Sequence, residues 1–290
     1  MSEFSSLVQI LMAGVTAGSI YALAALGFSL VFAVNGFLNL VQGEFVVLGG
    51  LVTISLTAAL GMPVLPAALA AILVSCVVGF VLQRLALSPR RRLSADAALM
   101  VTIGAAFIVR GADMIVFGRD MLSLPSFSGE KPIAIGEIAI STQSLWILGA
   151  LATTSVALWW FFNRTFSGKA MLACAASPTG AQLVGINLGC AATAAYVTSA
   201  GLGSIAGVVV APLNFVSYDE GLAVGIKGFI AAMIGGIGSY PGAVVGGVML
   251  GVIESLSAGY ISSLFRDASA FLVLLVVLLL FPNGLLGQRR

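Results

Sequence analysis

The sequence predicts an all-α membrane protein, a single polytopic bundle of about eight or nine membrane segments that include a short glycine-rich helix pair. Three observations support this fold class. The chain of 290 residues is 60% hydrophobic and only 8% charged, whereas a soluble domain is about 25% charged. The mean hydropathy is +1.12. Apolar runs close to the ~20 residues that cross a bilayer recur along the chain.

Turns and polar residues separate the apolar runs and define the expected order of the helices. Residues 7–34 form a first run that is long enough to cross a bilayer with some tilt. Polar residues between 35 and 44 interrupt the chain, and residues 61–63 turn it again. The remaining single spans are expected at residues 45–60, 63–87, 95–117, 143–163, 188–210 and 268–281.

The glycine-rich stretch at residues 225–251 is the most unusual part of the chain, because nine of its 27 residues are glycine. In a membrane, small residues let neighbouring helices approach closely. Turn-forming residues at 239–242 divide the stretch, so we expect two short helices within residues 223–260. Transporters build pathways from such broken segments, although a hairpin that only fills space has the same pattern. The candidate pathway residues here are Gly235, Gly236, Gly238 and Ser239, and we expect Gly235, Gly236 and Gly246 at helix–helix contacts.

The residues that the chain lacks exclude several kinds of chemistry. It has no histidine, which excludes a histidine-ligated metal and a Ser-His-Asp triad. Its three cysteines, Cys76, Cys174 and Cys190, are far apart and suggest neither a metal site nor a disulfide framework. No G-x-x-x-x-G-K-[ST] phosphate loop occurs. We therefore expect no enzymatic activity and no cofactor, and any ATP that drives the protein must be bound by partner subunits.

Basic residues in short loops predict the orientation of the chain. Residues 88–94, residues 164–169 and the C-terminus are basic, and such segments are retained in the cytoplasm. With the expected spans, all three fall on one side of the membrane. The sequence therefore predicts a multi-pass protein of the inner, or plasma, membrane whose C-terminus is cytoplasmic.

Polar and small residues around the first break in the chain are candidates for the translocation pathway or its gate: Asn35, Asn39, Gln42, Gly43 and Glu44. An ionisable residue such as Glu44 is costly inside a bilayer and is often functional. Near a membrane boundary it can instead cap a helix or reach interfacial water. The amides of the other residues can hydrogen-bond to a passing solute, although a role in joining helices is the more common one.

Lys227 is a further pathway candidate, because it lies early in the glycine-rich pair on the expected outer side. Its ammonium group can snorkel toward the membrane surface, or it can attract the carboxylate of a solute. Glu254, in the second helix of the pair, is a possible partner for Lys227. The sequence alone does not bring the two residues together.

Residues 164–187 are too polar to cross the membrane and too apolar for a simple linker. Good helix formers occupy residues 169–176, Pro178 interrupts them, and residues 179–184 can form a second short helix. Such helices need a surface to pack against, either a groove in an ATPase or the lipid surface. Gly168 and Gly185 bracket the segment and are expected in turns with positive φ. The candidate coupling residues are Arg164, Gly168, Lys169, Ala173, Ala175, Ala176 and Gly185.

Three stretches together resemble the inner-membrane permeases of the branched-chain amino acid ABC importer family, and most resemble the first of the two permeases that such importers pair. Residues 39–45 are similar to the family's N-F-A-H-G-E-F signature, with Gln42 in place of the histidine. Residues 164–187 are similar to its cytoplasmic R-T-x-x-G-x-A-M…G-I-N loop. Residues 235–243 look like its glycine-rich turn.

The resemblance implies a permease subunit that moves branched-chain amino acids, or related solutes such as urea, short amides or aromatic acids. It also implies the partners: a second homologous permease, two cytosolic ABC ATPases and a periplasmic or extracellular solute-binding protein, in a lipid membrane and without nucleic acid. A stand-alone secondary transporter or channel is the alternative class. That class favours paired carboxylates deep in the bundle.

Overall fold

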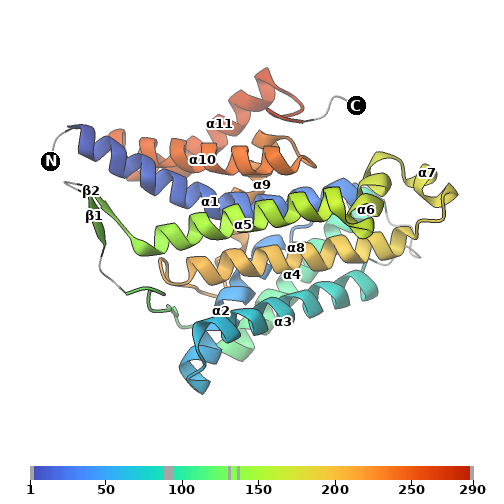
Figure 1. The fold of residues 1–290 in the computed structure, drawn as a ribbon, viewed down its shortest axis with the longest axis horizontal. Coiled ribbons are helices and arrows are strands. Elements are labelled where there is room, and N and C mark those ends of the chain that lie inside the picture. The colour runs from blue at the N-terminus through green and yellow to red at the C-terminus, as the bar shows by residue number, and fades with distance from the viewer. Residues whose placement is uncertain (1–2, 88–93, 130–131, 136–137, 288–290) are drawn as a thin grey trace.

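The computed structural model describes residues 3–87, 94–129, 132–135 and 138–287, and most of them are helical (Figure 1). The longer helices are α1 (Glu3–Asn35), α2 (Gln42–Leu60), α3 (Val64–Leu85), α4 (Ala95–Phe117), α5 (Thr142–Arg164), α8 (Leu188–Val210) and α10 (Tyr240–Tyr260). The shorter ones are α6 (Phe166–Ala176), α7 (Pro178–Leu183), α9 (Gly221–Gly235) and α11 (Arg266–Leu280), which follows a 3-10 turn at Ser263–Phe265. An antiparallel hairpin of β1 (Ile133–Ile135) and β2 (Ile138–Ile140) lies between α4 and α5.

Seven of the described helices are long and apolar enough to cross a membrane: α1, α2, α3, α4, α5, α8 and α10. Helix α9 is a shorter apolar helix, and α11 has 15 residues. The prediction of an all-α polytopic bundle is therefore confirmed, with the glycine-rich pair forming α9 and α10. Residues 88–93 and 290, which contributed to the predicted orientation, lie outside the described residues.

Side-chain caps explain where two functionally important helices begin. The side chain of Thr165 accepts a hydrogen bond from the amide of Gly168 at the start of α6. The side chain of Ser239 accepts one from the amide of Gly242 at the start of α10. A hydroxyl at this position satisfies a helix amide that otherwise has no partner. Local sequence thus fixes the first turns of both helices.

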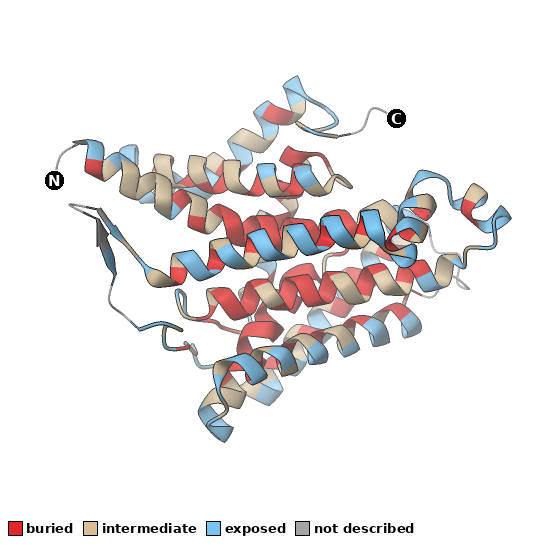
Figure 2. Cartoon of the chain, in the orientation of Figure 1, coloured by how far each residue is buried: buried red, intermediate tan, exposed pale blue. Residues whose placement is uncertain are grey.

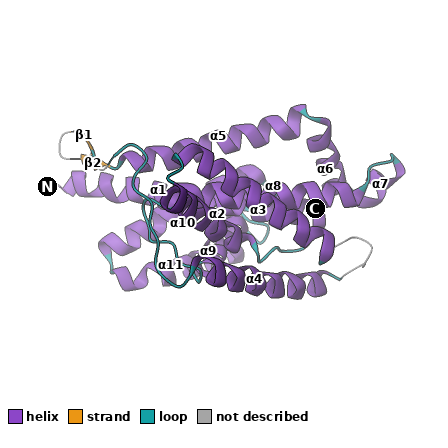
Figure 3. Ribbon diagram, turned by 90° about the horizontal axis from the view of Figure 1, so that it is seen from below, coloured by secondary structure: helices purple, strands orange, loops and turns teal. Residues whose placement is uncertain are grey.

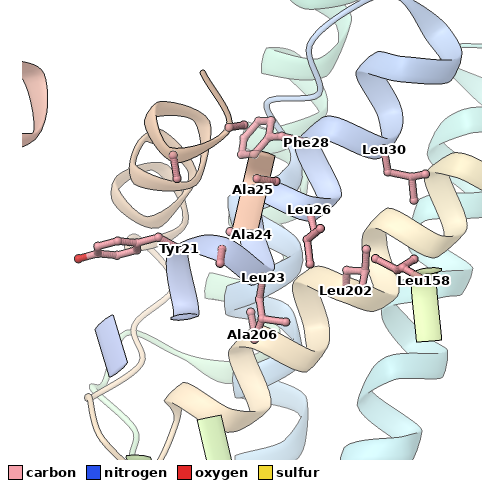
Figure 4. Packing of buried hydrophobic residues seen from close by; sticks show 14 of the residues in the cluster. Tyr21, Leu23, Ala24, Ala25, Leu26, Phe28, Leu30, Leu158, Leu202 and Ala206 are labelled. Carbon is pink, nitrogen blue, oxygen red and sulfur yellow. The ribbon is translucent and has the colours of Figure 1, made fainter. Parts of the chain in front are cut away.

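Helices α1 and α8 form the centre of the bundle, and α3, α4 and α5 form its rim. About 78% of the most apolar window of α1 and 72% of that of α8 are buried, compared with 22% for each rim helix (Figure 2). Figure 4 shows Leu23 of α1 beside Ala206 of α8, and Leu202 of α8 beside Leu158 of α5. The rim helices turn their remaining apolar surface outward, where a bilayer would cover it.

Small residues bring α1 and α10 into backbone contact. A Cβ atom at Gly18 would lie 2.7 Å from the carbonyl oxygen of Gly247, and one at Gly247 would lie 2.5 Å from the Cα atom of Ala22. Side-chain atoms do not approach backbone so closely, so any larger residue would push the helices apart. The glycine-rich pair is therefore packed tightly onto α1, as small residues allow in membrane bundles.

The two ends of the bundle carry different structures. Helices α6 and α7 lie at one end, and β1 and β2 lie at the opposite end, in both Figure 1 and Figure 3. The segment predicted to couple with ATPases is therefore separated from the hairpin by the length of the spanning helices.

Candidate translocation pathway and coupling surface

The chain breaks between α1 and α2, and α2 starts deep inside the bundle. Gly36, with a φ of +73°, follows the last residue of α1, and α2 begins at Gln42, whose side chain is fully buried. The amide of Gln42 donates to the carbonyl of Ser199 over 3.1 Å, and the hydroxyl of Ser199 donates to Oε1 of Gln42 over 2.5 Å. Ser199 is central in α8. The start of α2 therefore lies about half-way along that span.

Asn39, within the broken segment, is joined to the same helix. Its Oδ1 atom accepts a hydrogen bond from the hydroxyl of Tyr196 over 2.6 Å, and both side chains are fully buried. Asn39 and Gln42 thus make the interhelical bonds expected of residues that join helices. Asn35 is half-buried and lines a small pocket with Ala175. Among the described residues, the Nδ2 atoms of Asn35 and Asn39 have no acceptor, so each keeps a free donor.

Glu44 lies inside the bundle, with only 3% of its surface exposed. Its carboxylate packs against Gly221, the first residue of α9, where the positive end of a helix dipole stabilises an anion. No described residue donates a hydrogen bond to its Oε2 atom. Glu44 is therefore enclosed by helices, because α2 starts within the bundle and not at its edge.

Gly43 brings α2 and α9 into direct backbone contact. A Cβ atom at Gly43 would lie 2.8 Å from the Cα atom of Gly225 and would collide with the carbonyl of Gly221. Only glycine fits this contact without moving one of the helices. The first residues of α2 and the first turns of α9 are therefore fixed against each other.

The loop before α9 is acidic. The hydroxyl of Ser217 donates to Oδ1 of Asp219 over 2.6 Å, and this hydrogen bond lowers the pKa of Asp219. Burial raises the pKa of the neighbouring Glu220 carboxyl group. Together with Glu44, these carboxyl groups surround the N-terminus of α9, the end of a helix that favours negative charge.

Lys227 and Glu254 form an ion pair, which the sequence had only suggested. Nζ of Lys227 lies 3.2 Å from Oε1 of Glu254, whose side chain is fully buried. Asp267 lies 2.8 Å from Nζ of Lys227, and Nε of Arg266 lies 3.4 Å from Oε2 of Glu254. The hydroxyl of Tyr21 donates to that same Oε2 atom over 2.8 Å. Helices α1, α9, α10 and α11 thus meet at these five residues, which we call the charge cluster.

The turn between α9 and α10 holds the remaining predicted pathway residues. Gly236 and Gly238 have φ angles of +102° and +85°, which strongly favour glycine. Gly235 touches the backbone of Gly242 in α10, as predicted for a helix contact. Ser239 caps α10. The turn is therefore tight because of its glycines.

The segment that follows α11 closes over this turn. The amides of Leu285 and Leu286 donate to the carbonyls of Ile234 and Gly235, each over 2.9 Å. These carbonyls lie at the end of α9, where the last turn of a helix has no N–H donors of its own to pair with them. Gly236 was expected at a helix–helix contact, but it touches the backbone of residues 283–287. Its positive φ places it outside the helix, which explains the difference.

Helices α6 and α7 correspond to the predicted pair of short helices in the coupling segment. Gly185 has a φ of +84°, as expected. Gly168 was expected in a turn but lies within α6 and packs against the backbone of Phe161, because Thr165 already caps the helix. Arg164 is the last residue of α5 and not part of the connecting loop. Both corrections shift the start of the coupling helix by a few residues.

The alanines of α6 have different surroundings. Ala173 packs against the main hydrophobic core, whereas Lys169 is exposed. Ala175 and Ala176 line a cavity of about 700 Å³ at this end of the bundle. Gly238 and Ser239 line the same cavity from the α9–α10 turn. The predicted coupling segment and the predicted pathway turn therefore border one space.

Sequence reasoning missed five residues that complete the polar sites: Tyr21, Tyr196, Ser199, Arg266 and Asp267. One signal was available, since a buried tyrosine in an apolar span usually finds a partner for its hydroxyl group. The identity of the partners depends on how the helices cross, which the sequence does not give.

A spanning bundle with a helix broken at mid-depth, a closely packed glycine-rich pair and a cavity at one end is the architecture of a membrane permease. The chain belongs to the family described as the permease component of the branched-chain amino acid transport system, whose sequence profile matches residues 10–281. The resemblance seen in the sequence motifs is therefore confirmed.

Individual relatives cover the chain nearly end to end. It is 34% identical over 304 residues to the high-affinity branched-chain amino acid transport system permease protein LivH of Salmonella typhimurium, a match that covers 99% of this chain and 98% of the relative. It is 31% identical over 303 residues to BraD of Pseudomonas aeruginosa, with the same coverage. Its fold is similar to PsaBC from Streptococcus pneumoniae in complex with Fab, with a TM-score of 0.51 and 14% identity over 96% of this chain and 91% of that one.

Proposed function

We propose that the protein is one permease subunit of an ABC importer that moves branched-chain amino acids inward across the inner membrane. The relatives that match it nearly end to end are permeases of branched-chain amino acid transport systems. The observation that carries the coupling mechanism is the cavity of about 700 Å³ bordered by both α6 and the α9–α10 turn. Movement of α6 therefore has a direct route to the glycine-rich turn.

The surface of α6 and α7 suits the docking of a cytosolic ATPase. Phe166 and Leu183 expose 85% and 84% of their surfaces at this end of the bundle. Exposed apolar side chains beside a charged residue such as Lys169 are typical of an interaction site. We propose that two cytosolic ATPases bind ATP and that one of them docks here, which places the C-terminus in the cytoplasm. A second homologous permease completes the pathway, and an external binding protein delivers the amino acid.

Helix α9 is the element that would transmit the motion. Its C-terminal end leads into the turn that borders the cavity, and its N-terminal residues Gly221 and Gly225 touch Glu44 and Gly43 of α2. Packed interiors transmit displacement because they contain few voids. A shift of the turn thus displaces the start of α2, where the hydrogen bonds of Gln42 hold the broken segment. We propose that this segment is the gate.

Reconstitution of the complete transporter in proteoliposomes tests this function. We expect leucine uptake that requires ATP, both permeases and the binding protein. Competition by urea, short amides and aromatic acids distinguishes the solute classes that the family motifs allow. Uptake that continues when the ATPases are omitted would identify a stand-alone carrier or channel and overturn the proposal.

A further inference from the structure

The charge cluster has balanced charges and lies where α11 begins beside the span α10. Lys227 and Arg266 supply two positive charges, and Glu254 and Asp267 supply two negative charges. Tyr21 lies near the middle of α1, and Glu254 lies well inside the span α10. Charged groups at such a depth are unfavourable unless they are paired or in contact with water.

Pairing within the chain leaves part of the cluster open. The side chains of Lys227, Arg266 and Asp267 are 21%, 46% and 74% exposed. Helix α11 begins at Arg266, directly beside the buried Glu254, so these exposed charges do not lie at the outer end of a full span. Lipid tails would be a poor environment for them. This face therefore requires water or a polar partner in the assembled transporter.

One buried acceptor in the cluster is incompletely satisfied. Oε1 of Glu254 lies 3.2 Å from Nζ of Lys227, but no described residue donates a hydrogen bond to it. The ring of Tyr21 already faces a cation, because Nζ of Lys227 lies 5.4 Å from its centroid. Lys227 thus occupies the face of the Tyr21 ring, and Asp267, whose side chain is 74% exposed, is the carboxylate of the cluster that an ammonium group can reach. The cluster also offers two cations to a carboxylate.

The charge cluster and the cavity lie along the same sides of two helices. Eleven residues separate Tyr21 from Phe32 on α1, and eleven separate Asp267 from Leu278 on α11, where Phe32 and Leu278 line the cavity. Eleven residues are close to three helical turns, so each pair shares one side of its helix at a spacing of about 16 Å.

We infer that the charge cluster is a transient binding site for the zwitterionic head group of an α-amino acid. Lys227 and Arg266 bind the carboxylate and Asp267 binds the ammonium group, while the buried Glu254 and Tyr21 hold Lys227 in place. The inference rests on the proposed function, because it takes a free amino acid as the solute. Because these contacts involve only the head group, the site accepts amino acids that differ in their side chains.

Two phenylalanines provide a matched test of water access. Phe271 follows Asp267 by one turn of α11 and is 55% exposed, and Phe107 on the rim helix α4 is 63% exposed. Each is replaced by cysteine in the complete transporter after the native cysteines are removed, and a charged methanethiosulfonate is added. We expect Phe107→Cys to react about tenfold more slowly than Phe271→Cys, because the reactive thiolate forms only where water is present. Equal, slow labelling of both would overturn the inference.

Protection by ligands tests the zwitterion requirement. We expect leucine to slow the labelling of Phe271→Cys about fivefold or more, because an occupied site excludes the reagent. An equimolar mixture of 4-methylpentanoate and 3-methylbutylamine carries the same two charges on separate molecules. It should protect poorly, because one molecule with both charges makes the second contact intramolecular. Protection by either half alone, or no protection by leucine, would contradict the inference.

The double variant Lys227→Met with Glu254→Gln removes the central pair without leaving a buried unpaired charge. In the Phe271→Cys background we expect labelling to persist and protection by leucine to be lost. Protection that survives shows that the cluster is not the site. Labelling of the cysteine needs neither ATP nor the binding protein. The labelling experiment therefore tests the zwitterion site independently of the proposed function. Protection by leucine without ATP-driven uptake would contradict only the proposed function. ATP-driven uptake of leucine without protection would contradict only the inference.

Discussion

The hydroxyl of Ser199 donates to Oε1 of Gln42 over 2.5 Å, and the amide of Gln42 donates back to the carbonyl of Ser199 over 3.1 Å. This reciprocal pair joins the first residue of α2 to the middle of α8. Both side chains are fully buried, so water cannot replace either bond. The pair therefore determines where the broken helix restarts.

Loss of this pair should destabilise the protein. We expect Gln42→Leu to lower the free energy of unfolding by about 1–3 kcal/mol, because it removes both hydrogen bonds of the pair and leaves the hydroxyl of Ser199 only the carbonyl of Gly27, 3.0 Å away. The effects of Gln42→Leu and Ser199→Ala should not add in a double-mutant cycle. Denaturation of the purified protein in detergent measures both. Thr153→Ala is the control, since the hydroxyl of Thr153 bonds only to its own helix at an exposed site. Additive effects would show that the two residues act independently.

Contact between α2 and α9 should depend on the absence of a side chain at Gly43. We expect Gly43→Ala to abolish uptake or assembly, because its Cβ atom would meet the backbone of Gly221 and Gly225. Gly149→Ala on α5 is the matched control, because no atom lies within 4 Å of its added Cβ, and alanine favours a helix by about 1 kcal/mol over glycine. Leucine uptake and expression level are measured for both. If Gly43→Ala took up leucine as well as Gly149→Ala, the contact between α2 and α9 would not be needed to transmit the motion.

Closure of the α9–α10 turn should require glycine at position 236. Its φ is +102°, and an added side chain would meet the backbone of Asn283 and Gly287. We expect Gly236→Leu to be expressed in the membrane and to fail in uptake. Immunoblots and uptake assays in the same cells test this. Normal uptake would show that neither the positive φ nor the contact with the C-terminal segment matters for transport.

Most of the helical architecture could be predicted from the sequence, because apolar length and turn residues determine where spans begin and end. The glycine pair and both coupling helices also follow from local signals such as Ser239 and Pro178. The position of Gly168 was predicted wrongly because capping by Thr165 outweighed the tendency of glycine to form turns.

The polar partners could not be predicted, because they depend on how distant helices cross. Glu254 was a candidate partner for Lys227, but Arg266 and Asp267 join the pair only because α11 folds back beside α10. In the same way, the burial of Glu44 depends on Gly221, which lies far away in the sequence.

The orientation of the chain makes a separate prediction. Lys169 and Arg119 are both exposed, and they lie near opposite ends of the bundle. The positive-inside rule places Lys169 in the cytoplasm and Arg119 outside. We expect an impermeant thiol reagent added to intact cells to label Arg119→Cys and not Lys169→Cys in a cysteine-free background. The reverse pattern would invert the orientation and move the proposed ATPase surface to the outside.

In the proposed mechanism, work from ATP hydrolysis enters through α6 and reaches the glycine-rich turn across the shared cavity. Ala175 lines that cavity, and a bulky charge there should disturb the packing of α6 without touching the core. Stimulated ATP hydrolysis and leucine uptake, measured on the same reconstituted transporter, test the claim most directly. We expect Ala175→Glu to reduce both at least about tenfold, whereas Ala175→Ser, which nearly preserves the volume, leaves both close to normal. Full uptake and full stimulated hydrolysis by Ala175→Glu would contradict the account.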